Sequence, residues 1–184
     1  MNIMKLTSLL LVFFSLHLTA QNSILIKNAN VWDGISNQIN DNTSVLIEGN
    51  LIVEVSRQIN APINATIIDA KGKTLIPGLT DVHVHLALTM GMSEIRNNAD
   101  WMYTAVKAGK SAENFLMLGF TTVRDLGGPA FGIKRAVDEG LSPGPRIYPS
   151  GAFISQTSGH GDSRNRNEPS MYWSGAPMHP IDAL

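Results

Sequence analysis

Strand-like and helical runs alternate along the second half of the sequence, and this alternation limits the folds that the chain can adopt. Apolar residues at three- and four-residue spacing predict a helix from about Asn98 to Leu118, which Gly119 is placed to end. A shorter helix is expected before Gly140. Alternation of this kind favours parallel βαβ units, so the fold class is predicted to be α/β. Three runs are predicted to be its strands: Thr80 to Leu86, Thr121 to Leu126 and Arg146 to Gly151.

The preceding segment, residues 21–76, is predicted to form a small β-sheet module. Short β-branched runs alternate there with turn formers such as Asp33-Gly34 and Lys71-Gly72. The segment from Val45 to Val55 is predicted to be a hairpin around Gly49-Asn50. Because the runs are too short for a complete sandwich, we interpret the segment as the N-terminal part of a composite β-sandwich domain.

Residues 1–20 are typical of a signal peptide. After Lys5, an apolar run extends from Leu6 to Leu18, and the small residue Ala20 follows it. The alternative is a membrane anchor, but the run is well short of the roughly 20 apolar residues that span a bilayer, and His17 interrupts it. We therefore expect cleavage after Ala20 and an exported protein, periplasmic or secreted, without stable membrane association.

Charge and cysteine content narrow the choice of partners. The 14 Lys and Arg residues lie scattered among 15 Asp and Glu residues, without the clustered basic face that nucleic acid requires. We therefore expect no nucleic-acid partner, and the composition specifies no oligomeric state. Because the chain has no cysteine, any metal must be held by His, Asp, Glu or a modified Lys.

The first strand of the alternation carries an Asp-x-His-x-His sequence. Since side chains two apart in a strand share a face, Asp81, His83 and His85 are expected to point one way. Val82 and Val84 are expected to pack against helices on the other face. Two imidazoles that converge at the end of a strand favour half of a metal site, because a neutral His nitrogen is a good ligand for zinc and similar ions.

The alternative is a structural pair of histidines. With five His in 184 residues, chance alone gives roughly 0.13 His-x-His pairs, so the spacing by itself is weak evidence. The context strengthens it, because a Pro-Gly turn leads into the strand and two imidazoles between valines are costly to bury unpaired. We therefore predict that His83 and His85 bind a metal.

The sequence Pro77-Gly78-Leu79-Thr80-Asp81-Val82-His83-Val84-His85-Leu86 resembles the first barrel strand of the amidohydrolase superfamily. The resemblance covers nearly all of the chain after residue 20, and the later segments are most similar to the imidazolonepropionase-related and Xaa-Pro dipeptidase-like branch. It implies the N-terminal part of a (β/α)8 barrel in residues 77–184, with about three of the eight units present. Five further segments carry the resemblance: Val45 to Gly49, Asp69 to Gly78, Gly119 to Gly128, Gly144 to Ile147 and Gly159 to Asp162.

This resemblance implies a metal-dependent hydrolase that acts on carbon–nitrogen bonds of small amide or dipeptide substrates. His83 and His85 would bind one of one or two divalent ions, zinc or a similar metal, which activates a water molecule. The family's other ligands are a Lys on the fourth strand, a His on each of the fifth and sixth strands, and an Asp after the eighth. These are expected beyond Leu184, so the chain as given would lack most of the active site.

Other polar residues are weaker candidates. His160 follows the third strand between glycines and is either a possible substrate contact or a loop histidine bonded to solvent, and Asp162 is a lesser candidate beside it. Arg124 and Asp125 are expected to form ion pairs that brace the strand ends, rather than to act in catalysis. Asp81 is expected to orient an imidazole or a backbone amide.

At the level of sequence, two other interpretations stay open beside a working hydrolase: a truncated remnant and a binding module. The chain is either the start of such an enzyme or a non-catalytic truncated remnant with at most weak metal binding. A sugar- or peptide-binding module is a third possibility, but it needs a complete closed domain, which the strand count does not provide. An in-frame continuation that encodes a Lys and two further His at strand ends favours the enzyme.

Overall fold

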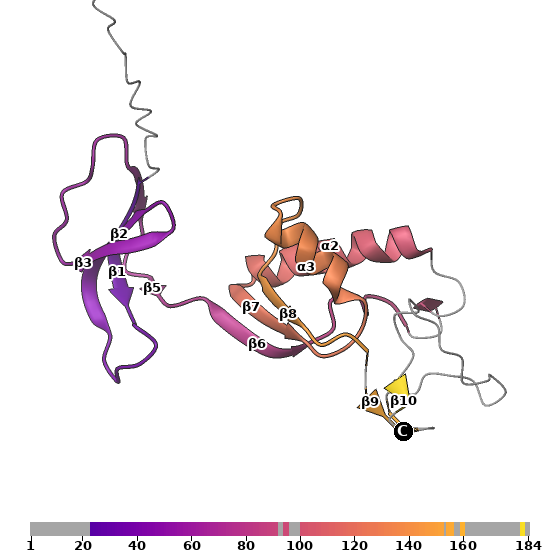
Figure 1. Cartoon of the computed structure of the whole chain (residues 1–184). Coiled ribbons are helices and arrows are strands. Elements are labelled where there is room, and N and C mark those ends of the chain that lie inside the picture. The colour runs from indigo at the N-terminus through magenta and orange to yellow at the C-terminus, as the bar shows by residue number, and fades with distance from the viewer. Residues whose placement is uncertain are drawn as a thin grey trace, which may run out of the picture. The chain divides into compact units, whose positions relative to one another are not determined.

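A computed structural model gives the arrangement of the chain, which divides into two compact units, Met1–Pro77 and Gly78–Leu184 (Figure 1). The signal-peptide prediction, the start of the expected helix at Asn98 and Asp162 fall outside the described residues. No helix within the described part of the chain is long and apolar enough to cross a membrane. The structure describes residues 23–91, 94–95, 100–152, 154–156, 159–160 and 181–182.

The N-terminal unit is a five-stranded mixed sheet. Strands β3, β2, β1 and β4 are neighbours in that order, and β5 also pairs with β1. Glu48 of β2 lies opposite Leu51 of β3, and Gly49 has a φ of 61°, which confirms the predicted hairpin. Leu25, Ala29 and Val45 are buried in this sheet. Its strands are β1 (Ser23–Val31), β2 (Asn40–Glu48), β3 (Leu51–Ser56), β4 (Thr66–Asp69) and β5 (Thr74–Leu75).

The C-terminal unit is built on three parallel strands with two helices against them, which confirms the predicted α/β class for this part of the chain (Figure 1). Strand β7 lies between β6 and β8, and all three are parallel. A short parallel pair follows, β9 (Ile154–Ser155) with β10 (Ile181–Asp182), where an irregular stretch was expected. The main elements are β6 (Leu79–Val84), α2 (Trp101–Met117), β7 (Phe120–Asp125), α3 (Ala130–Asp138) and β8 (Arg146–Pro149).

Local sequence explains where α2 begins and ends. The side chain of Asp100 caps the helix by accepting a hydrogen bond of 3.0 Å from the amide of Tyr103. Gly119 follows the last turn with a φ of 95°, a conformation that glycine adopts without strain, so its predicted role as a helix stop is confirmed. Thr104, Ala108 and Ala112 are buried at four-residue spacing along the helix.

The core of the C-terminal unit lies between the sheet and the helices. Each of the three strands contributes an aliphatic side chain, and Ala112 of α2 meets them. Because alanine is small, the helix axis comes close to the sheet at this point. The cluster consists of Val84, Leu86, Ala112, Val123 and Ile147, with Phe115, Phe120, Ile133 and Val137 packed against it.

Close approach of β6 and β7 depends on Gly78, directly before β6. A Cβ atom added there would lie 2.1 Å from Thr121 Oγ1 and 2.7 Å from Thr121 Cβ, distances that force the backbone to move. We predict that Gly78→Ala lowers the free energy of unfolding by about 1–3 kcal/mol, the usual range for overpacking. Denaturant unfolding monitored by circular dichroism measures this change.

Gly132 in α3 is the matched control for this substitution. No heavy atom lies within 4 Å of a Cβ added at Gly132. Alanine also forms helix better than glycine, so Gly132→Ala is expected to raise the free energy of unfolding by about 0.5–1 kcal/mol. Equal effects at both positions would contradict the role assigned to Gly78.

Candidate active site

The two histidines of the predicted metal site lie side by side at the end of β6. The ring centroids of His83 and His85 are 5.2 Å apart and the rings meet edge to face at 83°. The His83 side chain is exposed, the His85 side chain is half-buried, and Val84 between them is buried in the core. The structure therefore brings both imidazoles to one face, as the two-residue spacing predicted.

Strict alternation does not extend back to the start of β6, and two predictions are corrected there. Val82 was expected to pack against helices, but 65% of it is exposed. Asp81 was expected on the face of the histidines, but its register partner is Val123, which is buried in the core. The physical reason is a register shift between Asp81 and Val84, which interrupts the two-residue period.

The backbone of His83 is held by a neighbouring carboxylate. Asp81 Oδ1 accepts a hydrogen bond of 3.0 Å from the His83 amide. This contact agrees with the prediction that Asp81 orients an imidazole or a backbone amide, since it fixes the main chain that carries the first histidine.

The ring of His85 is held from the next strand. Its Nδ1 atom lies 3.2 Å from the carbonyl oxygen of Gly127, in the loop after β7. A carbonyl oxygen only accepts, so Nδ1 carries the proton in this hydrogen bond. In the neutral ring the lone pair is then on Nε2, and a backbone carbonyl bonded to the other ring nitrogen is the usual support of a metal-binding histidine.

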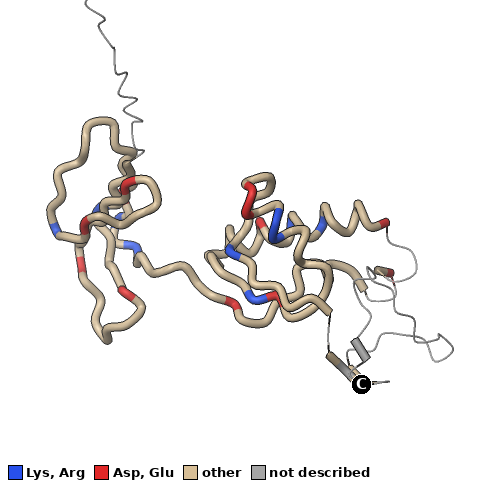
Figure 2. Tube along the Cα trace, in the orientation of Figure 1, with Lys and Arg blue, Asp and Glu red and all other residues tan. Residues whose placement is uncertain are grey.

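Asp125, the last residue of β7, is the polar group that sequence reasoning misjudged. It is fully buried, with 0% exposure, whereas Arg124 next to it is exposed. Basic and acidic positions are interspersed along the described trace of the C-terminal unit (Figure 2). The expected bracing of the strand ends is present, but it uses backbone amides and not an ion pair. Asp125 Oδ2 accepts from the Leu86 amide at 2.7 Å, and Oδ1 accepts from the Gly127 amide at 3.1 Å.

One feature of the sequence does distinguish Asp125. It stands two residues after Val123 and so takes a core-facing position in the strand, where an ionisable side chain is costly without partners. A carboxylate in such a position implies that donors surround it. The exposed position of Arg124 follows from the same alternation, which points adjacent side chains to opposite faces.

Other candidates are dispersed. His160 is exposed at a turn that the Gly159 amide closes with the Gln156 carbonyl at 2.8 Å. Among the described residues, no group of three or more His, Asp or Glu side chains is placed to hold a metal ion. The site given by this part of the chain is therefore the His83 and His85 pair with its supports on β6 and after β7.

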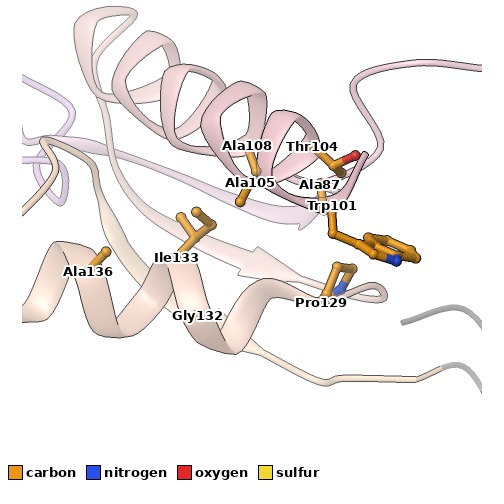
Figure 3. A pocket seen from close by; sticks show the side chains of 9 residues that line it. All are labelled: Ala87, Trp101, Thr104, Ala105, Ala108, Pro129, Gly132, Ile133 and Ala136. Atoms are coloured by element: carbon orange, nitrogen blue, oxygen red, sulfur yellow. The ribbon is translucent and has the colours of Figure 1, made fainter. Parts of the chain in front are cut away.

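A hollow of about 520 Å³ lies between α2 and α3 (Figure 3). Ala105 and Ala108 point across it toward Ile133, and Trp101 and Pro129 lie at one end. Its lining contains no side chain that binds metals or transfers protons, so this hollow does not supply the chemistry of the site. The lining residues are Ala87, Trp101, Thr104, Ala105, Ala108, Pro129, Gly132, Ile133 and Ala136.

Comparison with known proteins establishes the family. Residues 74–175, more than half of the 184-residue chain, match the model of the amidohydrolase family. The chain therefore belongs to the amidohydrolase family, as the resemblance of its first parallel strand indicated. Members of this family are generally metal-dependent.

Three relatives show how the similarity is distributed. An ochratoxinase from Aspergillus niger is 31% identical over 134 residues, which are 66% of this chain and 26% of that protein. A prolidase solved with N-methylphosphonate-L-proline is 33% identical with a TM-score of 0.76, over 86% of this chain and 40% of that one. A Xaa-Pro dipeptidase solved with methionine in the active site is 30% identical with a TM-score of 0.71, over 83% of this chain and 39% of that one. The chain thus spans about a quarter of the curated ochratoxinase and two fifths of the two solved structures.

The environment of Asp125 generates a prediction about pH. Burial raises the pKa of the Asp125 carboxyl above its ordinary value of 3.8. The hydrogen bonds from the Leu86 and Gly127 amides and the charge of His85 act in the opposite direction, but burial has the larger effect. In the window between the two pKa values the folded chain binds more protons than the unfolded chain, so stability falls as pH rises through that window. Relative to Asp125→Asn, which does not titrate, the wild-type free energy of unfolding should decline as pH rises from 3.8 and then level off.

Denaturant unfolding of both proteins at a series of pH values measures this difference. Both proteins share all other titrating groups, so the contributions of the groups that do not interact with Asp125 cancel in the comparison. A difference that grows in favour of the wild type as pH rises would show that the two amides outweigh burial, against this prediction.

Proposed function

We propose that this protein is a metal-dependent hydrolase that cleaves carbon–nitrogen bonds in small amide or dipeptide substrates. The observation that carries the proposal is the pair of adjacent imidazoles on one face of β6, with the ring of His85 oriented by Gly127. Membership of the amidohydrolase family supports the reaction class. The remaining ligands and the rest of a (β/α)8 barrel belong to the part of such an enzyme that follows these three strands.

The residues present fit a divalent ion. Gly127 holds the proton of His85 on Nδ1, so this ring offers Nε2 as a ligand atom, and His83 places a second imidazole next to it. Two imidazole nitrogens suit zinc and similar ions, of which the proposed site holds one or two. When bound, such an ion lowers the pKa of a water molecule and polarises the carbonyl of the scissile amide.

In this proposal, other residues of the chain hold and orient the two histidines that bind the metal. Asp81 fixes the main chain at His83, and Gly127 fixes the ring of His85, so the His85 ring keeps its direction before an ion arrives. The Asp81 contact lies within β6, and the Gly127 contact joins the ends of β6 and β7, where barrel enzymes have their active sites.

The substrate class is inferred from the solved relatives. The prolidase and the Xaa-Pro dipeptidase support a small dipeptide or related amide as the substrate of this protein. We propose that His160 contacts this substrate, because it is exposed on a loop after the third parallel strand.

We also propose that the protein is exported, periplasmic or secreted, with residues 1–20 as the signal peptide. Export with cleavage after Ala20 leaves Gln21 as the first residue. N-terminal sequencing of protein recovered from the periplasm or the medium tests this, and an intact Met1 would contradict it.

Metal binding is the first test of the proposed hydrolase. We predict that the purified protein binds Zn²⁺. His83→Ala or His85→Ala should weaken the Zn²⁺ affinity by more than about tenfold, because even the loss of a residue that only hydrogen-bonds a metal ligand commonly weakens metal binding by that factor. Isothermal titration of chelator-treated protein with Zn²⁺ measures the affinity.

His160→Ala is the matched control, because it removes one imidazole outside the pair. Its Zn²⁺ affinity should equal that of the wild type. If all three histidine variants bind Zn²⁺ as the wild type does, the ion is not held by His83 and His85 and the proposed site is wrong.

Steady-state kinetics test the role of His160. With a Xaa-Pro dipeptide as substrate, we predict that His160→Ala raises KM by about tenfold and changes kcat little, because it removes binding that the ground state and the transition state share. A variant with unchanged KM would place His160 outside the substrate site.

A further inference from the structure

The carboxylate of Asp125 contacts both backbone segments that determine where the His85 ring lies. Its Oδ2 atom accepts from the amide of Leu86, the residue that follows His85 in the chain. Its Oδ1 atom accepts from the amide of Gly127, whose carbonyl oxygen accepts from the His85 ring. One buried side chain therefore connects the two supports of a single imidazole.

We propose that Asp125 is a positioning residue that fixes the orientation and the tautomer of His85 through Leu86 and Gly127. One part of this inference rests on the proposed function, namely that the Nε2 atom of His85 faces a metal ion. The orientation of the ring itself follows from the contacts within the C-terminal unit, whether or not an ion is bound.

The geometry requires a carboxylate at this position. Both partners of Asp125 are N–H donors, so each of its oxygens must accept. The amide group of asparagine has nearly the same shape but carries only one oxygen, so its NH₂ group would face an N–H donor. An apolar side chain would leave two buried N–H groups without these acceptors, which is unfavourable.

Hydrogen bonds to both neighbouring strands hold the backbone around Asp125, so the position of its carboxylate is fixed. The Ser150 amide donates to the Asp125 carbonyl at 2.9 Å, which ties β7 to the end of β8. The Leu126 amide donates to the Val84 carbonyl at 3.0 Å, which ties the loop after β7 to β6. A shift of Gly127 or Leu86 is therefore opposed by contacts with all three parallel strands.

The tautomer of His85 gives a readout that a merely structural role would not change. The ¹⁵N shifts of the His85 ring in NMR spectra distinguish a proton on Nδ1 from a proton on Nε2. His85→Ala identifies the resonances. The wild type should carry its proton on Nδ1, and Asp125→Asn should show a mixture of tautomers together with a shifted Gly127 amide.

Asp138→Asn is the matched control, because it is the same substitution at an exposed helix position that pairs with Lys134. It should leave the His85 ring as in the wild type. In the same set of proteins, Asp125→Asn should weaken Zn²⁺ binding about 10–100-fold, the usual effect of removing a group behind a metal ligand.

The outcomes separate this inference from the proposed function. A wild-type ring with its proton on Nε2, or an Asp125→Asn ring and Zn²⁺ affinity like those of the wild type, overturns the positioning role. A changed tautomer in Asp125→Asn, in a protein whose wild type binds no Zn²⁺, supports positioning and refutes the metal site.

A measurement on the wild type keeps the test open if Asp125→Asn does not fold. Hydrogen-bond couplings in NMR spectra connect an amide nitrogen with the carboxyl carbon that accepts its proton. Couplings from the Leu86 and Gly127 amides to the Asp125 carboxyl carbon are expected. Their absence from both amides overturns the proposal.

Discussion

Satisfaction of backbone donors at the ends of the parallel strands is the constraint on which the candidate site depends. Where β6 and β7 end, their ladder of hydrogen bonds also ends, and buried N–H groups need other acceptors. Asp125 supplies two of them from one side chain, at Leu86 and Gly127. The cost of burying its carboxyl group is visible in its raised pKa, and the two amides offset part of that cost. The same contacts hold the residue after His85 and the loop whose carbonyl bonds the His85 ring, so strand termination and ligand orientation have one physical cause.

Small side chains bring the elements near enough for those contacts to form. Gly78 lets the start of β6 approach Thr121 of β7, where any Cβ atom would collide. Ala112, fully buried, lets α2 press on the sheet beneath it. These positions lie at the opposite end of the strands from the histidines, or on the other face of the sheet. They allow β6, β7 and α2 to pack closely, and the hydrogen bond of 2.7 Å between Asp125 and Leu86 forms within this packed unit.

The sequence contained enough to predict the order and type of the main elements, because their periods of two and 3.6 residues are plain and glycines mark the ends. It also predicted that His83 and His85 share a face, since they lie two apart within one strand. It failed where the answer depended on a partner strand. The register shift between Asp81 and Val84 moved Asp81 and exposed Val82, and a shift of this kind arises from pairing with β7 and not from a local pattern. Asp125 was likewise expected to form an ion pair, but within the described part of the chain its carboxylate accepts hydrogen bonds from two backbone amides.

The two histidines differ in how far the protein orients them in advance. At His83 the main chain is held by Asp81, while the side chain is exposed. At His85 the ring itself is held, by a carbonyl on the neighbouring strand's loop, and it is half-buried. Ordering a side chain has an entropic cost at the moment of binding, and that cost is smaller for a ring already fixed. In the proposed metal site, His85 therefore sets the position of the ion and His83 adjusts to it, and the edge-to-face contact at 5.2 Å keeps the second ring within reach of the first.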